Sequence, residues 1–348
     1  MSPRPRPSRT LPLTAIVPAF NEAPSVAETI RSLQGQTLPP YDIIVVDDCS
    51  TDETAAVAEA AGAWVIRPPK NKGSKAGAQT FALPLVATEF VMALDADTTL
   101  APDAIERMSK AFDDPEVAAA SGSVIPRHIR SVWERGRYVE YMFAFSFYKR
   151  IQDGYGKPLI SSGCFSLYRT DKLREVGGWS NRTLAEDMDL TWTLYQRGSK
   201  VRFMPDAVCY PIEPHNLDLM RKQLRRWSHG FIQNVQLHWQ GVLGLGYLRS
   251  MVSLALWDSI IASIGYLFAI PLLAILVNVA FLFAYVLDAP VILIPVLLSA
   301  LPRRELGKAL ASFPSYFPLR VANAVMMLKA AFLELVLRRP FRVYEKGH

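Results

Sequence analysis

Closely spaced carboxylates are the residues in this chain whose types and spacing could do chemistry. Asp95 and Asp97 are separated by one residue and follow an apolar run at positions 90–94. Two carboxylates on one side of such a turn can hold a hard divalent cation, Mg²⁺ or Mn²⁺, between protein oxygens and a diphosphate. Asp187 and Asp189 repeat the spacing, so the motif alone also fits solvated acidic residues. The position directly after a predicted buried strand favours a cation site for the first copy.

A second acidic pair occupies the corresponding place one strand earlier. Asp47 and Asp48 follow the apolar run at 43–46, where a carboxylate can accept a hydrogen bond from the N–H of a nucleotide base. Capping of the next helix is an alternative explanation. Lys72 and Lys75 lie in a Lys- and Gly-rich loop before a helix and could contact phosphate, although their spacing is not that of a P-loop. A solvated loop explains these lysines equally well.

Two later motifs could complete a site. Glu186 and Asp187 begin a predicted helix, where the helix dipole favours acidic residues whatever their function. Gln223, Arg226 and Trp227 lie just before a long apolar segment. Arg226 can form charge-assisted hydrogen bonds to a diphosphate, and Trp227 offers a flat apolar face for a sugar ring. A membrane-proximal anchor is the alternative for this second motif.

Short apolar runs alternate with helical patterns from Leu13 onward, which is typical of a βαβ sheet with parallel strands. Ligands of open α/β sheets collect outside the carboxyl ends of the strands, so the polar clusters after Val17, Val46 and Leu94 should meet in one crevice. Strands are predicted at 13–17, 43–46, 64–66, 90–94, 160–168 and 201–204. Helices are predicted at 24–35, 50–62, 75–83 and 184–196.

Two of these helices carry candidate capping boxes at their starts. Ser25 is followed by Glu28, and Ser50 is followed by Glu53. In a capping box the hydroxyl accepts from the backbone N–H three residues later, and the glutamate bonds back to the first residue. The spacing therefore predicts that both helices begin at these serines.

The apolar residues of the 348-residue chain are concentrated in its last third. Residues 251–301 contain only Asp258 and Asp288 as charges, although the whole chain is 20% charged with a mean hydropathy of +0.14. This stretch is long enough for two crossings, since each needs about 20 residues. Arg249 precedes it, and basic residues follow it at Arg303, Arg304 and Lys308. The positive-inside rule then predicts a hairpin with both ends in the cytosol.

A third apolar segment, 313–337, carries three charges. Arg320, Lys329 and Glu334 would be costly in hydrocarbon, so an interfacial helix is favoured and a third crossing shielded by protein is the alternative. Residues 231–250, with interspersed aromatic side chains, could also lie along the membrane surface.

Charge and cysteine usage narrow the expected partners and compartment. The net charge is +6, but the basic residues are scattered, flank the apolar segment or lie in the tail 1–12, so anionic lipid headgroups explain them better than nucleic acid. That tail has no apolar stretch and is predicted to be neither a signal peptide nor a membrane helix. Cys49, Cys164 and Cys209 lack the spacing of a disulfide or zinc framework, which favours a reducing compartment.

Several short motifs follow one another along the chain. They are 18–22 (Pro-Ala-Phe-Asn-Glu), 46–52 (Val-Asp-Asp-Cys-Ser-Thr-Asp), 75–78 (Lys-Ala-Gly-Ala), 95–97 (Asp-Ala-Asp), 162–164 (Ser-Gly-Cys), 186–187 (Glu-Asp) and 223–227. This ordered set resembles the family 2 glycosyltransferases with a GT-A fold. The Gln-x-x-Arg-Trp element at 223–227, a Gly-Gly-Trp at 177–179 and the apolar segments narrow the resemblance to membrane polysaccharide synthases, particularly poly-N-acetylglucosamine synthases, with hyaluronan and chitin synthases also similar.

This resemblance implies an α/β fold of the GT-A (Rossmann-like) type, in which helices flank a mixed, mostly parallel sheet and C-terminal transmembrane and interfacial helices follow. The expected divisions are a flexible basic tail at 1–12, a cytosolic GT-A domain at 13–230, an interfacial helix at 231–250, a transmembrane hairpin at 251–301, and an interfacial or third membrane helix with a basic tail at 302–348.

The resemblance also implies roles for individual residues. Asp187, beside Glu186, would be the catalytic base, and Asp97 would be the main ligand of Mg²⁺ or Mn²⁺ with Asp95 in support. The uridine diphosphate of a UDP-sugar donor would be bound by Ala19, Asn21, Glu22, Asp47, Asp48, Lys75 and Asp95. The diphosphate and the acceptor end would be held by Gly163, Gln223, Arg226 and Trp227.

We therefore expect an inverting enzyme of the cell membrane that transfers a sugar, N-acetylglucosamine by the resemblance, to a growing polysaccharide or oligosaccharide. Transfer of one sugar to a polyprenyl phosphate lipid and a non-catalytic nucleotide-sugar-binding module are the alternatives. The pattern departs from many such synthases because no membrane helix precedes the catalytic domain and no gating loop is evident after Trp227. A partner subunit or a homo-oligomer therefore stays open.

Overall fold

The computed structural model describes residues 11–287 and 289–343, which form two compact units. The first unit contains the chain up to Val124 together with Ile160–Arg182 and Glu186–Pro211. The second unit contains Ile125–Leu159, Thr183–Ala185 and the chain from Ile212 onward. The predicted basic tail at 1–12 falls almost wholly outside the described residues, as does the last part of the predicted C-terminal tail, 344–348.

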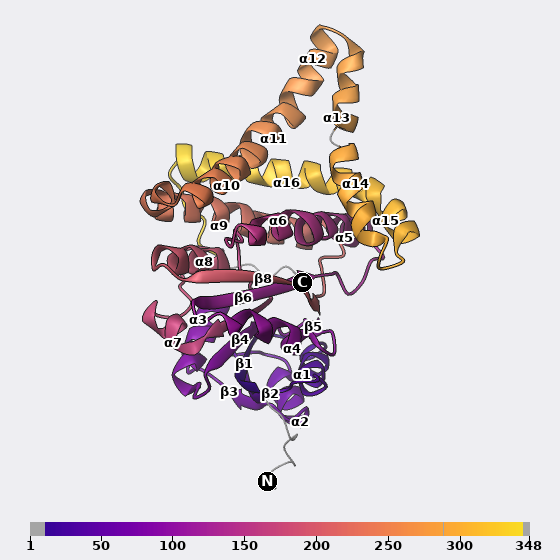
Figure 1. Cartoon of the computed structure of the whole chain (residues 1–348). Helices are drawn as coiled ribbons and strands as arrows, with labels where there is room; N and C mark the ends of the chain where they lie inside the picture. The colour runs from indigo at the N-terminus through magenta and orange to yellow at the C-terminus, as the bar shows by residue number, and fades with distance from the viewer. Residues whose placement is uncertain (1–10, 288, 344–348) are drawn as a thin grey trace. The chain divides into compact units, whose positions relative to one another are not determined.

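The first unit is built on an eight-stranded mixed sheet in the order β3-β2-β1-β4-β7-β6-β8-β5 (Figure 1). Its strands are β1 Leu11–Ala19, β2 Pro40–Asp47, β3 Trp64–Ile66, β4 Phe90–Leu94, β5 Thr99–Leu100, β6 Val117–Val124, β7 Phe165–Arg169 and β8 Lys200–Tyr210. Neighbours from β3 through β4 are parallel, as are β6 and β8, whereas β7 is antiparallel to both of its neighbours and β5 to β8. The predicted mixed, mostly parallel sheet is confirmed.

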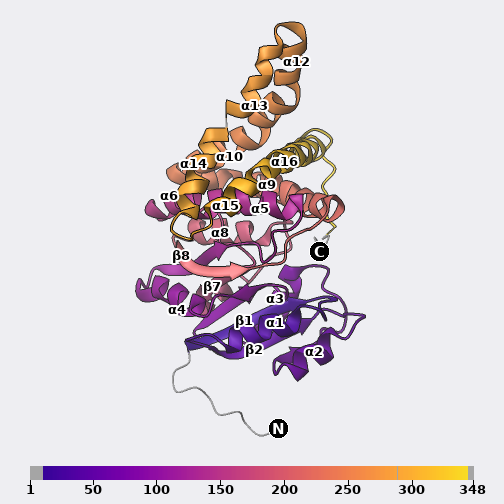
Figure 2. The same cartoon turned by 90° about the vertical axis from the view of Figure 1, so that its right-hand side faces the viewer.

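Helices lie against this sheet (Figure 2), and an amphipathic helix does so with its apolar stripe turned towards the sheet. In α1, for example, Val26, Ile30 and Leu33 are fully buried, as the helical spacing predicts. The helices of the first unit are α1 Val26–Gln34, α2 Thr54–Ala60, α3 Lys75–Ala82, α4 Ala104–Ser109, α7 Thr170–Glu175 and α8 Glu186–Gln196, with short 3₁₀ turns η1 Leu83–Leu85 and η2 Lys110–Asp113.

Strand register places the ends of β1, β2, β4 and β7 at one edge of the sheet. Ala19 pairs with Asp47 in the parallel β1–β2 ladder, and the parallel β4 ends at Leu94. Because β7 runs antiparallel to β4, Leu94 pairs with Phe165, the first residue of β7. The loop that precedes β7 therefore lies beside the turn that follows β4, and the backbone N–H of Asp95 donates to the Cys164 carbonyl at 3.3 Å.

Both predicted capping boxes are wrong. The Ser25 hydroxyl donates to the Glu22 carboxylate at 2.6 Å, so it does not cap α1. The hydroxyl of Ser50 accepts from the backbone of Asn21, and α2 begins only at Thr54. In both cases the turn that follows the preceding strand supplies the serine hydroxyl with a hydrogen-bond partner outside the helix.

One predicted strand is wrong in its bounds, and the strand β6 was missed. The strand expected at 160–168 is formed only from Phe165 onward, because 160–164 make the turns that carry Gly163. The strand β6 was not predicted, since its sequence Val-Ala-Ala-Ala-Ser-Gly-Ser-Val lacks large β-formers. Small residues are required there, because a Cβ on Gly122 would lie 2.3 Å from the Ala207 carbonyl oxygen and 2.7 Å from the Phe165 ring.

The second unit is helical. Its core joins α5 to the C-terminal helices, with Tyr138, Val139 and Met142 packed against Ile292 and Val296. Its elements are α5 Val132–Phe143, η3 Ala144–Tyr148, α6 Lys149–Gly154, α9 Leu217–Gly244, α10 Gly246–Leu256, η4 Trp257–Ile261, α11 Ala262–Ile264, η5 Gly265–Ala269, α12 Ile270–Leu276, η6 Val279–Phe283, α13 Ala284–Leu287, α14 Ala289–Ala300, α15 Leu306–Ser312, η7 Phe313–Ser315, α16 Tyr316–Ala331 and η8 Phe332–Val336.

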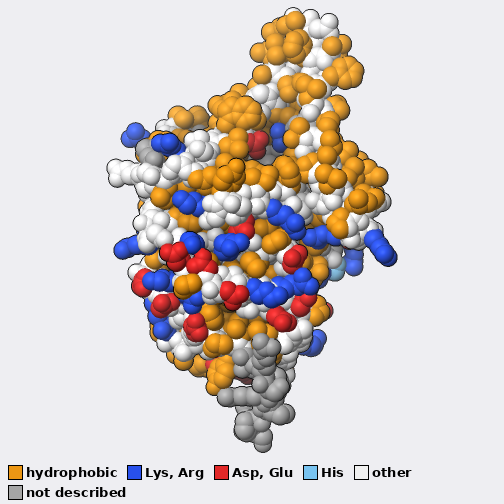
Figure 3. Space-filling view, in the orientation of Figure 1, with side chains coloured by type: hydrophobic (Ala, Val, Ile, Leu, Met, Phe, Trp, Pro, Cys, Tyr) orange, Lys and Arg blue, Asp and Glu red, His pale blue; other side chains and the backbone are white. Residues whose placement is uncertain are grey.

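Within the described part of the chain, two helical stretches are long and apolar enough to cross a membrane, Gly246–Leu276 and Val279–Ala300. Their side chains are mostly exposed, and Figure 3 shows hydrophobic side chains gathered over α12 and α13. Large apolar surfaces of this kind mark interaction with lipid or protein. The candidate spans agree in position with the predicted hairpin at 251–301, and the expected interfacial span 231–250 is divided between α9 and α10.

Candidate active site

Lys75 and Asp95 meet at the edge of the sheet where β4 ends. Lys75 is the first residue of α3, and its ammonium group forms an ion pair with the Asp95 carboxylate. The same ammonium donates to the backbone carbonyl of Gly163 at 2.8 Å. The Lys75 side chain is only 10% exposed, so this cation is fixed in place beside the turn between Asp95 and Asp97.

Asp187 reaches the same place from the start of α8. Its Oδ2 accepts from the backbone N–H of Gly163 at 2.9 Å, and its Oδ1 accepts from Met188 N–H at 2.8 Å. A hydrogen bond of 2.9 Å from Ser161 N–H to Thr191 also fixes the loop against α8. The two sides of Gly163 thus contact Lys75 and Asp187, and the structure brings these predicted residues together with Asp95.

Tyr168 is a buried tyrosine that interacts electrostatically with Asp187. Burial, reinforced by the Asp187 carboxylate, raises the pKa of Tyr168 to about 12. The Tyr168 phenol therefore stays neutral at physiological pH.

Asp97 lies in the turn after β4 and is 4% exposed. Thr98 donates to its Oδ1 at 3.1 Å, and the turn is closed by a bond from Thr98 N–H to the Asp95 carbonyl at 3.1 Å. Across residues 11–287 and 289–343, no group of three or more His, Cys, Asp and Glu side chains could hold a metal ion alone. The oxygen donors of Asp95 and Asp97 fit a cation of the Mg²⁺ or Mn²⁺ type whose remaining ligands are phosphate oxygens and water.

Asp48 organises the loop that begins α3. Its Oδ1 accepts from Lys72 N–H at 2.7 Å, and its carbonyl accepts from the Asn71 amide at 2.7 Å. Burial raises the pKa of the Asp48 carboxyl, although the Lys72 hydrogen bond opposes this rise. The predicted base-binding carboxylate therefore faces the loop that supplies Lys75.

The other predicted nucleotide-binding residues hold the neighbouring loops. The Asp47 carboxylate accepts from Ser50 N–H at 3.0 Å. A bond from a backbone N–H to a side chain is what the capping alternative expected, but this bond closes a turn before α2 begins. The side-chain carbonyl of Asn21 accepts from Thr51 N–H at 2.8 Å, while the Ala19 carbonyl accepts from Asp48 N–H at 2.8 Å. The Glu22 carboxylate accepts from Ser25, and its backbone N–H donates to Thr54 at 2.7 Å.

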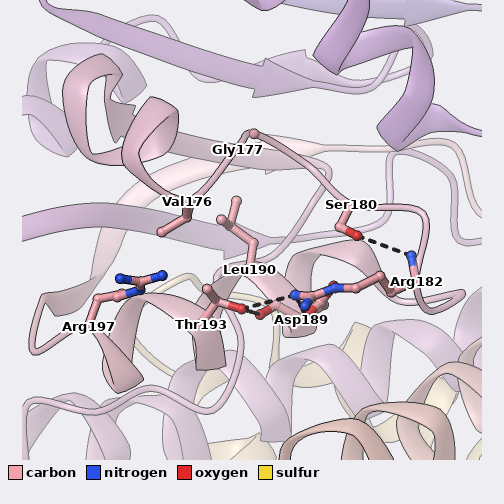
Figure 4. A pocket seen from close by; sticks show the side chains of 9 residues that line it. Val176, Gly177, Ser180, Arg182, Asp189, Leu190, Thr193 and Arg197 are labelled. Carbon is pink, nitrogen blue, oxygen red and sulfur yellow. Dashed lines mark hydrogen bonds and ion pairs between the residues drawn. The ribbon is translucent and has the colours of Figure 1, made fainter.

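Asp187 and Asp189 differ in role despite their shared spacing. Arg182 binds Asp189 through two nitrogens, at 2.7 and 3.2 Å, and the Asp189 side chain is 1% exposed (Figure 4). This pair borders a hollow of about 370 Å³ lined by Val176, Gly177, Gly178, Ser180, Arg182, Asp189, Leu190, Thr193 and Arg197. Asp189 is therefore paired with Arg182, whereas Asp187 accepts from two backbone N–H groups.

The loop that leads to α8 is also fastened to α3. Thr80 donates to the Trp179 carbonyl at 2.7 Å, and the Ser74 hydroxyl donates to Asn181. Ser74 is the N-cap of α3 and accepts from Gly77 N–H at 3.0 Å. The helix that supplies Lys75 and the loop that precedes Asp187 are thereby connected within the first unit.

In the second unit, Gln223 and Trp227 are organised by a buried arginine. Arg137 donates to Gln223 Oε1 at 2.6 Å, and its guanidinium lies 4.4 Å from the centre of the Trp227 ring. Arg226 lies on the same helix, α9. Burial lowers the pKa of Arg137, but the carboxylates of Glu140 and Glu213 outweigh this and raise the pKa above its usual value.

Sequence reasoning missed Arg137. An arginine in the amphipathic helix 132–143 is expected at the surface, yet the Arg137 side chain is 1% exposed. Glu213 was missed as well; it is buried and accepts from the Tyr141 hydroxyl at 2.9 Å. One signal in the sequence could have pointed to such residues: the Gln223 amide and the Trp227 indole need partners in the folded protein.

Comparison with known proteins shows which family the sequence resembles. Residues 14–177 match the family model described as glycosyl transferase family 2. Over these residues, a little under half of its length, the chain is similar to family 2 glycosyltransferases. The matched region includes Asp48, Lys75, Asp95, Asp97 and Gly163.

Curated proteins similar to the chain include poly-beta-1,6-N-acetyl-D-glucosamine synthases. Those of Staphylococcus aureus strain COL and Staphylococcus epidermidis strain ATCC 35984 are each 28% identical to the chain over 223 residues. The matched part is 63% of this chain and 54% of each relative, so the chain aligns with about half the length of these relatives.

Solved structures share the GT-A fold. The mannosyltransferase PcManGT from Pyrobaculum calidifontis, in complex with GDP-Man and Mn²⁺, has a TM-score of 0.62 at 19% identity, covering 96% of this chain and 90% of its own. TarS 1–349 of S. aureus, in complex with UDP, has a TM-score of 0.52 at 17% identity, covering 92% and 90%. The fold predicted from the resemblance is therefore confirmed.

Proposed function

We propose that the protein is an inverting glycosyltransferase that moves N-acetylglucosamine from UDP-N-acetylglucosamine to a growing polysaccharide or oligosaccharide at a membrane. The observation that carries the proposal is the arrangement around Gly163, whose carbonyl accepts from Lys75 and whose N–H donates to Asp187. A cation for a diphosphate and a base for an acceptor hydroxyl thus lie on two sides of one residue. The family match and the synthase relatives support the same reaction.

The donor side of the reaction is assigned to the turn after β4 and the start of α3. Lys75 would contact the diphosphate, and Asp48 the base, with Ala19, Asn21, Glu22 and Asp47 shaping the loops between them. Asp97 and Asp95 would hold Mg²⁺ or Mn²⁺. Such an ion neutralises charge that develops on the leaving diphosphate.

Asp187 is assigned as the general base. A sugar hydroxyl is a poor nucleophile, so a carboxylate must take its proton as the new bond forms. Two backbone N–H groups orient the Asp187 oxygens, and each carboxylate oxygen has a further lone pair for the acceptor hydroxyl. Attack opposite the leaving diphosphate inverts the anomeric centre. Glu186 begins the same helix and is buried.

We assign Gln223, Arg226 and Trp227 to the diphosphate and the acceptor end. One face of the Trp227 ring is covered by Arg137, so a sugar would stack on the other face. The proposal also includes a cytosolic catalytic domain with limits at 13–230 and two membrane crossings within 251–301. It further includes a partner subunit or a second copy of the chain. Two apolar helices and the synthase relatives suggest membrane association.

The test uses the full chain in lipid nanodiscs with Mg²⁺ or Mn²⁺ and a panel of radiolabelled nucleotide sugars. We expect UDP release and a labelled polymer from UDP-N-acetylglucosamine. Asp187→Asn should abolish both while UDP still binds. Asp171→Asn, which alters an exposed carboxylate on α7, is the matched control and should retain turnover.

Three outcomes would count against parts of the proposal. Normal turnover by Asp187→Asn would remove the assigned base. A single labelled lipid-linked sugar would replace polymer synthesis by transfer to a polyprenyl phosphate. Donor binding without hydrolysis or transfer, for every acceptor offered, would indicate a binding module.

A further inference from the structure

The three residues that precede the catalytic helix are held by α9. The Leu184 N–H donates to the side-chain carbonyl of Gln233 at 3.0 Å. The Asn234 amide donates to Thr183 Oγ1 and to the Ala185 carbonyl, each at 3.1 Å. These contacts lie within the second unit, and the chain continues directly from Ala185 into the first turn of α8.

The approach is close because α9 has a glycine at the point of contact. A Cβ on Gly230 would lie 2.7 Å from both the backbone nitrogen and the Cβ of Ala185, and 3.0 Å from the Leu184 carbonyl carbon. Two backbone segments therefore touch without an intervening side chain. The Asn234 amide also bonds the Gly230 carbonyl at 2.9 Å, which orders this turn of α9.

Glu334 fixes the direction of the Gln233 amide. Its Oε1 accepts from Gln233 Nε2 at 2.8 Å and from Phe341 N–H at 3.1 Å, and it lies 2.6 Å from His229 Nδ1. The second proton of Gln233 Nε2 goes to the Phe341 carbonyl at 2.8 Å. With both amide protons directed at acceptors, the carbonyl of Gln233 must face the Leu184 N–H.

The same network gives a structural role to Glu334, one of the three charged residues in the apolar segment 313–337. Glu334 and His229 are buried, with side chains 3% and 2% exposed. A buried carboxylate is costly unless it accepts several hydrogen bonds, and Glu334 accepts them from its neighbours in the folded protein. These contacts hold the Glu334 carboxylate, and with it the Gln233 amide, in one arrangement.

We propose that Gln233 and Asn234 are positioning residues for Asp187, and that Glu334 orients Gln233 for this purpose. The proposal rests on the proposed function, in which Asp187 is the base. Asp187 follows the clamped residues by two positions in the chain, so displacement of Leu184 and Ala185 moves the start of α8. The donor-binding residues belong to other loops and keep their contacts.

The experiment compares Gln233→Ala with Gln236→Ala, a matched control at an exposed glutamine on the same helix. In the full chain in nanodiscs with UDP-N-acetylglucosamine, Gln233→Ala should lower kcat by about 10- to 100-fold, since small displacements of a reacting group are costly. The KM for the donor and the affinity for UDP should stay unchanged. Gln236→Ala should match the wild type.

A charge exchange separates positioning from general destabilisation. Gln233→Glu turns an amide donor into a carboxylate facing Glu334, so kcat should fall as in Gln233→Ala. The double variant Gln233→Glu with Glu334→Gln restores one donor and one acceptor between these two side chains, so its kcat should exceed that of Gln233→Glu, although the Phe341 carbonyl still lacks its donor. Failure of the double variant to exceed either single variant would contradict a specific contact.

Hydrogen–deuterium exchange at Leu184 supplies a readout that needs no activity. Exchange should be faster in Gln233→Ala and unchanged in Gln236→Ala. Unchanged exchange together with wild-type kcat in Gln233→Ala would overturn the positioning role. An inactive wild type would contradict the proposed function instead. The exchange data would still decide whether Gln233 fixes the segment Thr183–Ala185.

Discussion

Gly163→Ala would insert a methyl group between Asp187, the proposed base, and Lys75 of the proposed donor site. The new Cβ would lie 3.2 Å from Asp187 Oδ2, 3.3 Å from Lys75 Nζ and 3.4 Å from Asp187 Cβ. These distances are a few tenths of an ångström too short, so the two side chains must move apart. Both are the ends of side chains, not backbone, and the fold can absorb the change.

The expected size of the effect differs between stability and rate. Overpacking costs about 1 to 3 kcal/mol, and the lower end applies because flexible groups yield. A loss of about 1 kcal/mol lowers the melting temperature by about 2–4 °C for a domain of this size. Misplacing a reacting group costs about 10- to 100-fold in kcat. The rate should therefore fall far more than folding is weakened.

The assay measures UDP release and melting for the wild type, Gly163→Ala and Gly154→Ala. A Cβ on Gly154 would have open space, so this control should behave as the wild type. Gly163→Ala should bind UDP more weakly as well, since Lys75 is displaced. Wild-type kcat and UDP affinity in a folded Gly163→Ala would refute the idea that Lys75 and Asp187 serve one reaction.

Three other predictions concern single residues. The raised pKa of Asp48 means that its carboxyl takes up a proton at higher pH than an ordinary aspartate, so donor affinity should fall on acidification before other aspartates titrate; Asp48→Asn should bind weakly with a flatter pH profile. Gly230→Ala should lower kcat through its clash with Ala185, whereas Gly244→Ala, with open space at its Cβ, should not; equal kcat values would contradict the contact. Arg137→Leu removes the positive charge that faces the buried Glu213 carboxylate and should lower the free energy of unfolding by about 3–5 kcal/mol, as measured by denaturation; a change below about 1 kcal/mol would show that the pair is dispensable.

The parallel half of the sheet could be predicted because its strands are short, continuous apolar runs. Strand β4 was predicted with the bounds that the structure shows, Phe90–Leu94, since all five residues are buried. Parallel strands share one carboxyl edge, which is why Asp47, Asp48 and Asp95 could be expected near one another. The antiparallel half was harder, because β6 is made of small residues whose signal is weak.

The site was predictable only where a strand or helix end carried the motif. Spacing could not distinguish Asp187 from Asp189, because the distinction depends on Arg182, which reaches Asp189 from a preceding loop. Nothing local marked Arg137 as the partner of Gln223. Such long-range pairings arise from tertiary packing, which a pattern along one segment does not encode.

The most direct test of the account is a structure of the full chain with UDP and Mn²⁺, in which anomalous scattering locates the ion. We expect the manganese peak against Asp97 and Asp95, with the diphosphate beside Lys75 and a carboxylate oxygen of Asp187 facing the terminal phosphate. A diphosphate bound elsewhere, with Lys75 and Asp187 still joined through Gly163, would contradict the central claim.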